Sequence, residues 1–222
     1  MLIARGRVET VAAIVYLGVA LFLSAGRLDW WMAWAYFGIL VINTVLVARI
    51  MHPELLAERT GIGEGAKKWD FFLALYLGRV GPLAMLTVAG LDKRFGWSAD
   101  VPLAWQWVAL LVVVLSMVLS DWAMMVNKFF AAVVRIQKDR GHTVVTGGPY
   151  RFVRHPGYAA TLLNYIAAPF MLGTLWALIP AGLIVAVTIL RTALEDRTLR
   201  EELEGYQDYP RRVRYRLLPG VW

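Results

Sequence analysis

The sequence predicts an all-α integral membrane protein with four spanning helices, a C-terminal helical hairpin and a short cytosolic tail, without a Rossmann domain. Of the 222 residues, 59% are hydrophobic and 18% are charged, and the mean hydropathy is +0.56. Soluble domains are about 45–50% apolar and about 25% charged, so this composition favours a lipid environment. The apolar residues also form long blocks rather than amphipathic stripes, which excludes an ordinary soluble domain.

Four blocks are long enough to cross a bilayer, which requires about 20 mostly apolar residues. They cover residues 8–25, 30–50, 71–91 and 103–126. The second and fourth blocks open with Trp residues, which favour the headgroup zone. Two further apolar stretches, 156–172 and 175–194, are separated only by Gly173 and Thr174 and predict a helical hairpin. We therefore expect a four-helix membrane region, 1–126, and a second region, 127–222, which ends in a charged tail.

A polar stretch, 51–70, joins the second and third blocks and is expected to form an amphipathic cytosolic loop. Pro53 and Glu54 favour the first turn of a short surface helix there. The run from Gly61 to Gly65 lacks the preceding strand and following helix that a dinucleotide fingerprint requires. We interpret this run as a flexible loop.

The positive charges predict the orientation in the membrane. With the N-terminus in the cytoplasm, every Lys and Arg lies inside except Arg27, Lys93 and Arg94, which lie outside, and Arg79, which lies within a helix. This asymmetry agrees with the positive-inside rule. We predict a multi-pass protein with both termini cytoplasmic, in the inner membrane if the source is bacterial. The net charge of +7 and pI near 9.9 then reflect cationic loops and no nucleic-acid surface.

The chain has no Cys, which excludes disulfides, thiolate nucleophiles and zinc–thiolate or iron–sulfur sites. We predict no metal site. The expected partners are the lipid bilayer and a small molecule, with no obligate protein partner.

Two charged residues fall within predicted spans, Arg79 in the third and Asp121 in the fourth. Charges inside a span are costly, and they tend to face partners or cavities. At about 1.5 Å per residue, the depths of the two differ by a few ångströms, so the side chains could meet. Two interpretations stay open: a structural ion pair that locks two helices, and a proton or substrate path.

The segment TGGPYRFVRHPGY, residues 146–158, concentrates polar chemistry at the entrance of the hairpin. Pro156 suits a first helical turn, and the free backbone N–H groups beside it, with Arg154 and His155, would favour an anion. A basic anchor for lipid phosphates would explain the Arg residues but not the Gly-Gly-Pro-Tyr and His-Pro-Gly-Tyr elements. Past the hairpin, Glu195 and Asp196 lie near a helix C-terminus, where the dipole disfavours carboxylates. These acids are either a solvated helix end or a site for hydroxyls or a cation.

Together, these motifs resemble the isoprenylcysteine carboxyl methyltransferase family, which has relatives among the phospholipid N-methyltransferases. The resemblance covers about residues 140–222 and rests on Gly148-Pro149-Tyr150-Arg151, Arg154-His155-Pro156-x-Tyr158, Glu195-Asp196-x-x-Leu199 and the ending Tyr215-Arg216-Leu217-Leu218-Pro219-Gly220. It implies that region 127–222 is catalytic and binds S-adenosyl-L-methionine at the cytosolic face. The implied reaction is methyl transfer to a lipophilic acceptor, such as an isoprenylcysteine carboxylate or another lipid or small molecule.

The resemblance also implies roles for individual residues. It assigns cofactor binding to Gly148, Pro149, Tyr150, Arg154, His155, Pro156, Tyr158, Glu195 and Asp196. It assigns catalytic roles, facing the cofactor or the acceptor, to Arg191, Glu195, Tyr209 and Arg212. The residue types suit this chemistry because Arg154 can bind a carboxylate, Glu195 can accept from a ribose diol, and Tyr faces attract a sulfonium.

Two other functions stay open at this point. A membrane reductase that uses NADPH shares the His-Pro-x-Tyr element, although such enzymes are usually larger. A non-enzymatic transporter subunit would explain charged residues within the spans. Binding of S-adenosylmethionine or of NADPH separates the two enzymes, and flux through liposomes would support the transporter.

Overall fold

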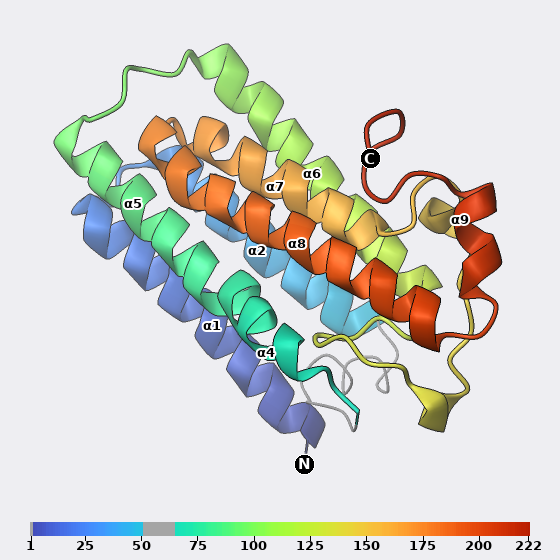
Figure 1. The fold of residues 1–222 in the computed structure, drawn as a ribbon. Helices are drawn as coiled ribbons and strands as arrows, with labels where there is room; N and C mark the ends of the chain where they lie inside the picture. Colours follow the sequence, from blue (N-terminus) through green and yellow to red (C-terminus); the bar gives the residue numbers. More distant parts are fainter. Residues whose placement is uncertain (1, 51–64) are drawn as a thin grey trace.

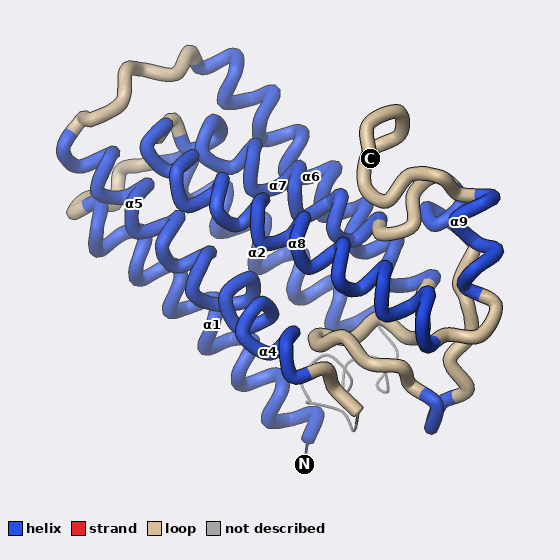
Figure 2. Tube along the Cα trace, viewed as in Figure 1, coloured by secondary structure: helices blue, strands red, loops and turns tan. Residues whose placement is uncertain are grey.

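The computed structural model describes the backbone of residues 2–50 and 65–222, and the side chains of residues 11–50 and 65–222. Within these residues the chain is helical, and no described residue is in a β-strand (Figure 2). This confirms the predicted all-α class without a Rossmann domain. The expected surface helix and glycine loop fall, apart from Gly65, within residues 51–64 and lie outside the described residues.

The long helices run side by side, and the C-terminal tail lies at one end of the bundle (Figure 1). In chain order, the long elements are α1 (Leu2–Ala25), α2 (Trp31–Ile50), α4 (Lys68–Leu75), the π-helical turn η1 (Tyr76–Val80), α5 (Gly81–Phe95), α6 (Leu103–Val126), α7 (Pro156–Leu172) and α8 (Leu178–Glu202). Short helical turns are η2 (Lys138–Arg140), η3 (Gly148–Arg151), η4 (Leu175–Ala177), η5 (Tyr206–Asp208) and α9 (Tyr209–Arg212). Since α4, η1 and α5 follow one another without a break, they act as one long helix.

Four helical segments among the described residues are long and apolar enough to cross a membrane: Trp31–Ile50, Lys68–Phe95, Leu103–Val126 and Leu175–Glu202. The described part of α1, Val11–Ala25, is a shorter apolar helix. The last segment is the second arm of the predicted hairpin. It is longer than the predicted 175–194 because the helix continues into charged residues up to Glu202.

The turn of the hairpin lies at the end of the bundle that is opposite to the C-terminal tail. Asp92, at the end of α5, is 2% exposed. Its carboxylate accepts hydrogen bonds from the backbone N–H of Ser98 at 2.8 Å and from that of Trp176 at 3.1 Å. The Trp176 N–H lies in η4, the turn that leads into α8, and N–H groups at a helix start have no partner within the helix. These bonds fix the hairpin turn beside the loop that follows α5.

Arg79 and Asp121 lie on helices that pack against different neighbours. The continuous helix that contains Arg79 packs on α1 and α8, whereas α6, which contains Asp121, packs mainly on α7. Among the described residues, no ion pair joins these two side chains. The expected structural pair between them is therefore wrong, because the hairpin helices α7 and α8 separate the two spans.

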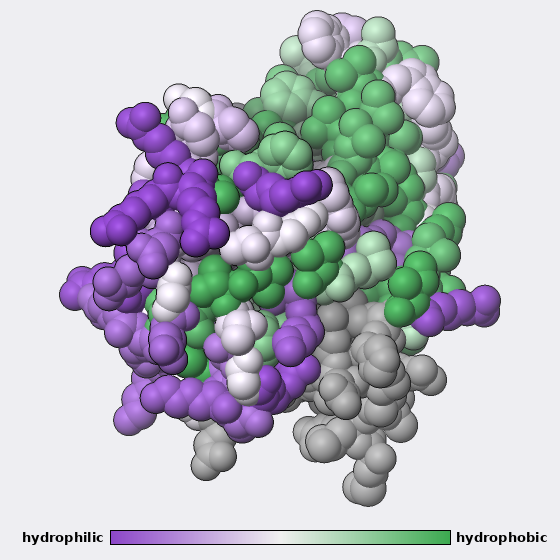
Figure 3. Space-filling model, turned by 90° about the vertical axis from the view of Figure 1, so that its right-hand side faces the viewer, coloured by the Kyte–Doolittle hydropathy of each residue, from purple (hydrophilic) through white to green (hydrophobic). Residues whose placement is uncertain are grey.

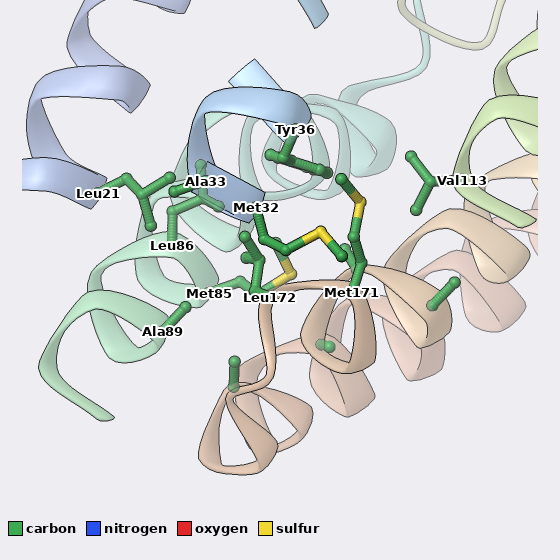
Figure 4. Close-up of a cluster of buried hydrophobic side chains, with 14 of the residues drawn as sticks. Leu21, Met32, Ala33, Tyr36, Met85, Leu86, Ala89, Val113, Met171 and Leu172 are labelled. Atoms are coloured by element: carbon green, nitrogen blue, oxygen red, sulfur yellow. The ribbon is translucent and has the colours of Figure 1, made fainter. Parts of the chain in front are cut away.

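The apolar core lies where α1, α2, α5 and α7 converge, with side chains of all four pointing toward one another (Figure 4). Leu21, Met32, Met85, Met171 and Leu172 are each at most 2% exposed. Lipid tails are as apolar as these side chains, so close packing rather than escape from water holds the helices together. Methionine suits this role because its unbranched chain fills irregular gaps.

The helices α5 and α1 approach each other closely at Gly90. A Cβ atom built at Gly90 would collide with the Ser24 hydroxyl, and would lie 2.6 Å from the carbonyl oxygen of Leu21 and 2.8 Å from the amide of Ala25. Two of these three contacts are backbone atoms, which cannot turn away as a side chain can. Glycine at this position therefore sets the distance between α1 and α5.

We predict that Gly90→Ala separates these helices and lowers the free energy of unfolding by about 1–3 kcal/mol, as overpacked substitutions do. Thermal melting in detergent measures the effect. Gly182→Ala in α8 is the matched control, because a Cβ atom there has no neighbour within 4 Å. The control should leave the melting temperature unchanged or raise it slightly through its better helix propensity. Equal melting temperatures for the two variants would contradict the role of Gly90.

Candidate functional site

A cavity of about 550 Å³ lies between the helices and the segments that follow α6 and α8. At its polar end it is lined by residues 142–145 and by Leu203, Tyr206 and Tyr209. Farther in, it is lined by side chains of α4, η1, α6, α7 and α8. Figure 3 views the end of the molecule that carries the C-terminal tail, where charged side chains adjoin the hydrophobic surface of the bundle. One cavity thus reaches both the polar end and the apolar helices.

Gly148 allows the loop after α6 to lie against that helix. Its φ is +53°, and a Cβ atom would lie 2.8 Å from a methyl carbon of Val126 and 3.1 Å from the indole nitrogen of Trp122. Both the positive φ and the contact require glycine. The following turn, η3, buries Pro149 and Tyr150 and brings the chain to His155, the residue before α7.

Asp196 is the centre of a buried polar network at the end of α8. Its carboxylate is 1% exposed and accepts from Arg154 Nε at 2.8 Å, Tyr206 Oη at 2.9 Å and Arg216 Nε at 3.0 Å. His155 Nε2 lies 3.4 Å from the same carboxylate. A buried carboxylate without partners would be strongly unfavourable, and here each oxygen has several. Asp196 itself is not among the residues that line the cavity.

Arg154 extends this network to the C-terminal tail. Its Nη1 donates to the carbonyl oxygens of Val213 at 2.8 Å and Arg214 at 2.7 Å. The backbone N–H of Arg154 donates to Tyr215, and that of His155 donates to Arg216, both at 2.9 Å. The tail therefore occupies these two amides, which precede Pro156, and they are not free to bind an anion.

The side chains of Glu195 and its neighbour Asp196 point to different sides of α8. Successive residues on a helix are about 100° apart, so two adjacent acids face different surroundings. Glu195 lines the cavity, and its Oε2 accepts a hydrogen bond from Tyr158 Oη at 2.5 Å. Tyr158 also lines the cavity, and its ring stacks on that of His155 with centroids 5.9 Å apart.

Arg191 lies one turn before Glu195 and is fixed by an acid from another part of the chain. Its Nε and Nη2 donate to the two oxygens of Asp70 at 2.6 and 2.8 Å, and Nη2 also donates to the carbonyl of Ala132 at 2.7 Å. Asp70 is fully buried and accepts from the amide of Val134 as well, at 2.6 Å. The guanidinium carbon of Arg191 lies 5.5 Å from the centre of the Tyr158 ring. Asp70 thus holds Arg191 in the wall of the cavity.

Aromatic side chains line the polar end. The rings of Tyr206 and Tyr209 meet edge to face with centroids 5.5 Å apart, and Tyr209 Oη donates to the carbonyl oxygen of Tyr150 at 2.5 Å. Burial raises the pKa of Tyr209 and of Tyr150 above the ordinary value for tyrosine. Both phenols therefore stay protonated at neutral pH. Tyr209 Oη acts as a donor, whereas Tyr150 Oη accepts a hydrogen bond from Asn127 Nδ2 at 3.1 Å.

His142 forms another part of this wall. Its ring lies over Phe129 with centroids 4.4 Å apart, and its Nδ1 accepts from the amide of Gln137 at 3.3 Å. Burial, together with the charges of Arg135 and Arg140, lowers the pKa of His142 to about 4. The ring is therefore neutral at pH 7.

The structure brings most of the predicted site residues together around the cavity. Those that line it are Tyr150, Arg154, His155, Tyr158, Arg191, Glu195 and Tyr209. Gly148, Pro149, Pro156, Asp196 and Arg212 are not among its lining residues. Of these, Arg212 is exposed on α9, whereas Pro149, Pro156 and Asp196 are buried behind the wall.

Several residues that line the cavity or hold its wall were not predicted from the sequence. These are Asp70, the loop residues 129–135 and 142–145, Leu203, and the helical residues Ala74, Leu75, Leu77 and Gly78. Asp70 ends the polar stretch before the third span, and an acid at the membrane boundary was the signal that could have been noticed. The loop residues carry no such signal because their contributions depend on tertiary packing alone.

Comparison with known families identifies one match. Residues 104–204 match the family model described as phospholipid methyltransferase. This range holds α6, the loop with residues 146–158, and α7 and α8 with Glu195 and Asp196, and it ends before Tyr206 and the C-terminal tail. No curated protein matches the chain.

We predict that Asp196→Ala lowers the free energy of unfolding by about 3–5 kcal/mol, because it leaves buried Arg154 without its acid. For a chain of this size, the melting temperature should fall by on the order of 10 °C. Asp208→Ala is the control, since its ion pair with Arg211 is exposed and should contribute little. Limited proteolysis should cut the C-terminal tail of the Asp196 variant faster than that of the control. Equal melting and equal cleavage would show that Asp196 does not hold the tail.

We predict that His142 makes the folded protein less stable in acid. Its folded pKa of about 4 is below the unfolded value of 6.5, so its contribution is complete above pH 6.5. Between pH 6.5 and 4, His142 is protonated in the unfolded chain but neutral in the folded protein. The melting temperature should therefore fall as the pH falls through this window. His142→Phe keeps a ring over Phe129 but cannot titrate, and should flatten that part of the profile. Parallel profiles for wild type and variant would contradict this assignment.

Proposed function

We propose that the chain is a membrane methyltransferase that methylates a lipophilic acceptor with S-adenosyl-L-methionine, because residues 104–204 match the phospholipid methyltransferase family, which is one of the isoprenylcysteine carboxyl methyltransferase-like membrane methyltransferases. The observation that supports this most is the cavity, which joins the polar end of the protein to its membrane helices, with Glu195 and Tyr158 between the two. A water-soluble cofactor and a lipid-soluble acceptor need such a connection.

The residues at the polar end fit the chemistry of this cofactor. Glu195 offers carboxylate lone pairs beyond the one that Tyr158 uses, and these suit the two hydroxyls of a ribose. Tyr206 and Tyr209 offer aromatic surface for an adenine ring, and the face of Tyr158 would attract a sulfonium. A cavity of about 550 Å³ is within the range of sites for ligands of this size, about 300–1,000 Å³.

Arg154 and Arg191 differ in what they offer an anionic group. Among the described residues, the Arg154 guanidinium donates to Asp196 and to carbonyls of the tail, so we assign it the task of fixing the wall. Arg191 lines the cavity, and its Nη1 has no hydrogen bond among the described residues. We assign Arg191 to the cofactor or the acceptor, held in place by Asp70.

The residues of the chain do the work of positioning and of excluding water. Bound S-adenosyl-L-methionine would supply a methyl group whose bond to sulfur breaks as its bond to the acceptor atom forms. Glu195, Tyr158 and Arg191 lie on rigid helices, which favours in-line alignment of two ligands. The turn after α8 lines the polar end through Leu203, Tyr206 and Tyr209, and these side chains would limit the access of water. Tyr209 and Arg212 keep their predicted catalytic roles as proposals.

We also propose that the end with the C-terminal tail is cytoplasmic. The start of α1, the segment after α6 and the tail lie toward this end, and the hairpin turn lies at the other (Figure 1). This end therefore collects most of the Lys and Arg residues, as the positive-inside rule expects. The cofactor would then enter from the compartment that makes it.

We predict that the purified protein in detergent binds S-adenosylmethionine and S-adenosylhomocysteine but not NADPH, and that Glu195→Gln weakens binding roughly 10- to 100-fold. The variant loses hydrogen bonds from hydroxyls to a charged acceptor, worth about 1.5–3 kcal/mol. Isothermal titration calorimetry measures the affinities. Glu201→Gln is the matched control, because that glutamate pairs with Arg197 on the exposed face of the same helix.

Two outcomes would count against the proposal. Binding of NADPH alone would move the chain to the membrane reductases. Wild-type affinity in Glu195→Gln, with a normal melting temperature, would remove Glu195 from the cofactor site.

A further inference from the structure

The lining of the cavity extends into the membrane region, and we call this part of the cavity the membrane arm. Beyond Glu195 and Tyr158, it is lined by Thr161 and Tyr165 of α7, by Ser120 of α6, and by the helical turn that ends at Arg79. At about 1.5 Å per residue, Arg79 lies about 16 Å along its helix from Lys68, and Tyr165 lies about 14 Å along α7 from Pro156. This arm therefore approaches the middle of a hydrocarbon core that is about 30 Å thick.

Arg79 differs from the other arginines that line the cavity. Arg135, Arg154 and Arg191 each form an ion pair with an aspartate, namely Asp139, Asp196 and Asp70 respectively. Arg79 has no ion pair among the described residues, and its side chain is exposed. A guanidinium is charged at any relevant pH, and an exposed one inside a span must face a partner or a cavity. The membrane arm thus carries a positive charge that no described acid neutralises.

The backbone around Arg79 is irregular. Arg79 lies in the π-helical turn η1, and its carbonyl oxygen accepts from Tyr16 Oη of α1 at 3.1 Å. A π-helical turn widens the helix by one residue and is common at functional sites. The hydroxyl of Tyr16 gives this carbonyl a partner outside its own helix. The π-helical turn therefore coincides with a charge that no described acid neutralises.

The lining of the arm is otherwise apolar or neutral. Glu195 is the only carboxylate among the described lining residues. Leu75 and Leu77 supply apolar surface next to Arg79, and Ser120, Thr161 and Tyr165 supply hydroxyls. This combination suits an amphiphile that has an apolar chain and one anionic group.

We propose that Arg79 forms an acceptor subsite that selects lipophilic molecules with an anionic group, a carboxylate or a phosphate, in the membrane arm of the cavity. This inference rests on the proposed methyltransferase function, because it identifies the arm as the acceptor site. Arg191 pairs with Asp70, and Arg154 pairs with Asp196. In this proposal, the anionic group of the acceptor pairs with Arg79 in the same way. An ordinary annular lipid would place its phosphate nearer the membrane surface than the backbone of Arg79.

The test compares Arg79→Gln with Arg79→Lys, which keeps the charge. Arg94→Gln is the matched control, since Arg94 is an exposed arginine at the other end of the same continuous helix. Melting temperatures are measured in a neutral detergent with oleate, dioleoyl phosphatidate or oleyl alcohol as the probe. Circular dichroism checks that each variant is folded.

We expect oleate, phosphatidate or both to raise the melting temperature of the wild type, of Arg79→Lys and of Arg94→Gln, and oleyl alcohol to have little effect. In Arg79→Gln, the apparent affinity for the anionic probe should fall at least tenfold, while calorimetric affinity for S-adenosylmethionine stays unchanged. The larger of the two anionic shifts identifies carboxylate or phosphate as the group that is bound.

An equal response of Arg79→Gln and wild type to the anionic probes would overturn the subsite, as would an equal response to oleyl alcohol. These results leave cofactor binding intact, so they contradict this inference alone. Absence of cofactor binding in the wild type would instead contradict the proposed methyltransferase function.

Discussion

Asp196 is buried at the end of α8 and receives hydrogen bonds from residues that are distant in sequence. Through Arg154 it connects the segment before α7 to the C-terminal tail, and through Tyr206 to the turn after α8. A buried carboxylate tolerates only arrangements in which its partners are in place, which makes this network specific as well as stabilising. The polar end of the cavity is therefore assembled around a residue that does not line it.

Asp70 is a second buried acid, and it connects the first half of the chain to α8. It lies at the start of the third span, and its pairing with Arg191 crosses 121 residues of sequence. With Asp70 and Asp196 behind the wall, two of the arginines in it are neutralised and fixed. Glu195 is then left as the only carboxylate that faces the cavity among its described lining residues. Asp70 and Asp196 thus hold the wall of the site in place, whereas Glu195 has carboxylate lone pairs that can accept hydrogen bonds from a ligand.

Much of the fold follows from hydropathy, and the site follows only in part. Runs of apolar residues located the spans because a bilayer tolerates little else, and the Gly-Pro and His-Pro elements located the turns before α7. The sequence could not tell which of Glu195 and Asp196 faces the cavity, because both faces of α8 are occupied. The ion pair expected between Arg79 and Asp121 failed for a related reason: depth along a helix can be read from sequence, but the neighbours of that helix cannot. Asp70 was overlooked since its partner lies in a distant helix.

The arrangement of charges along the cavity follows from the two solvents that it joins. At the polar end, water and the tail can stabilise many charges, and the arginines there have protein acids as partners. In the membrane arm, no such solvent is available, and each charge requires a specific partner. A protein that kept Arg79 solely for stability would supply an acid beside it, as it does for Arg191. A guanidinium that lacks such an acid among the described residues is instead suited to a partner that arrives from outside the chain. Such a partner must be soluble in lipid and anionic, which are the two properties that the lining of the arm selects.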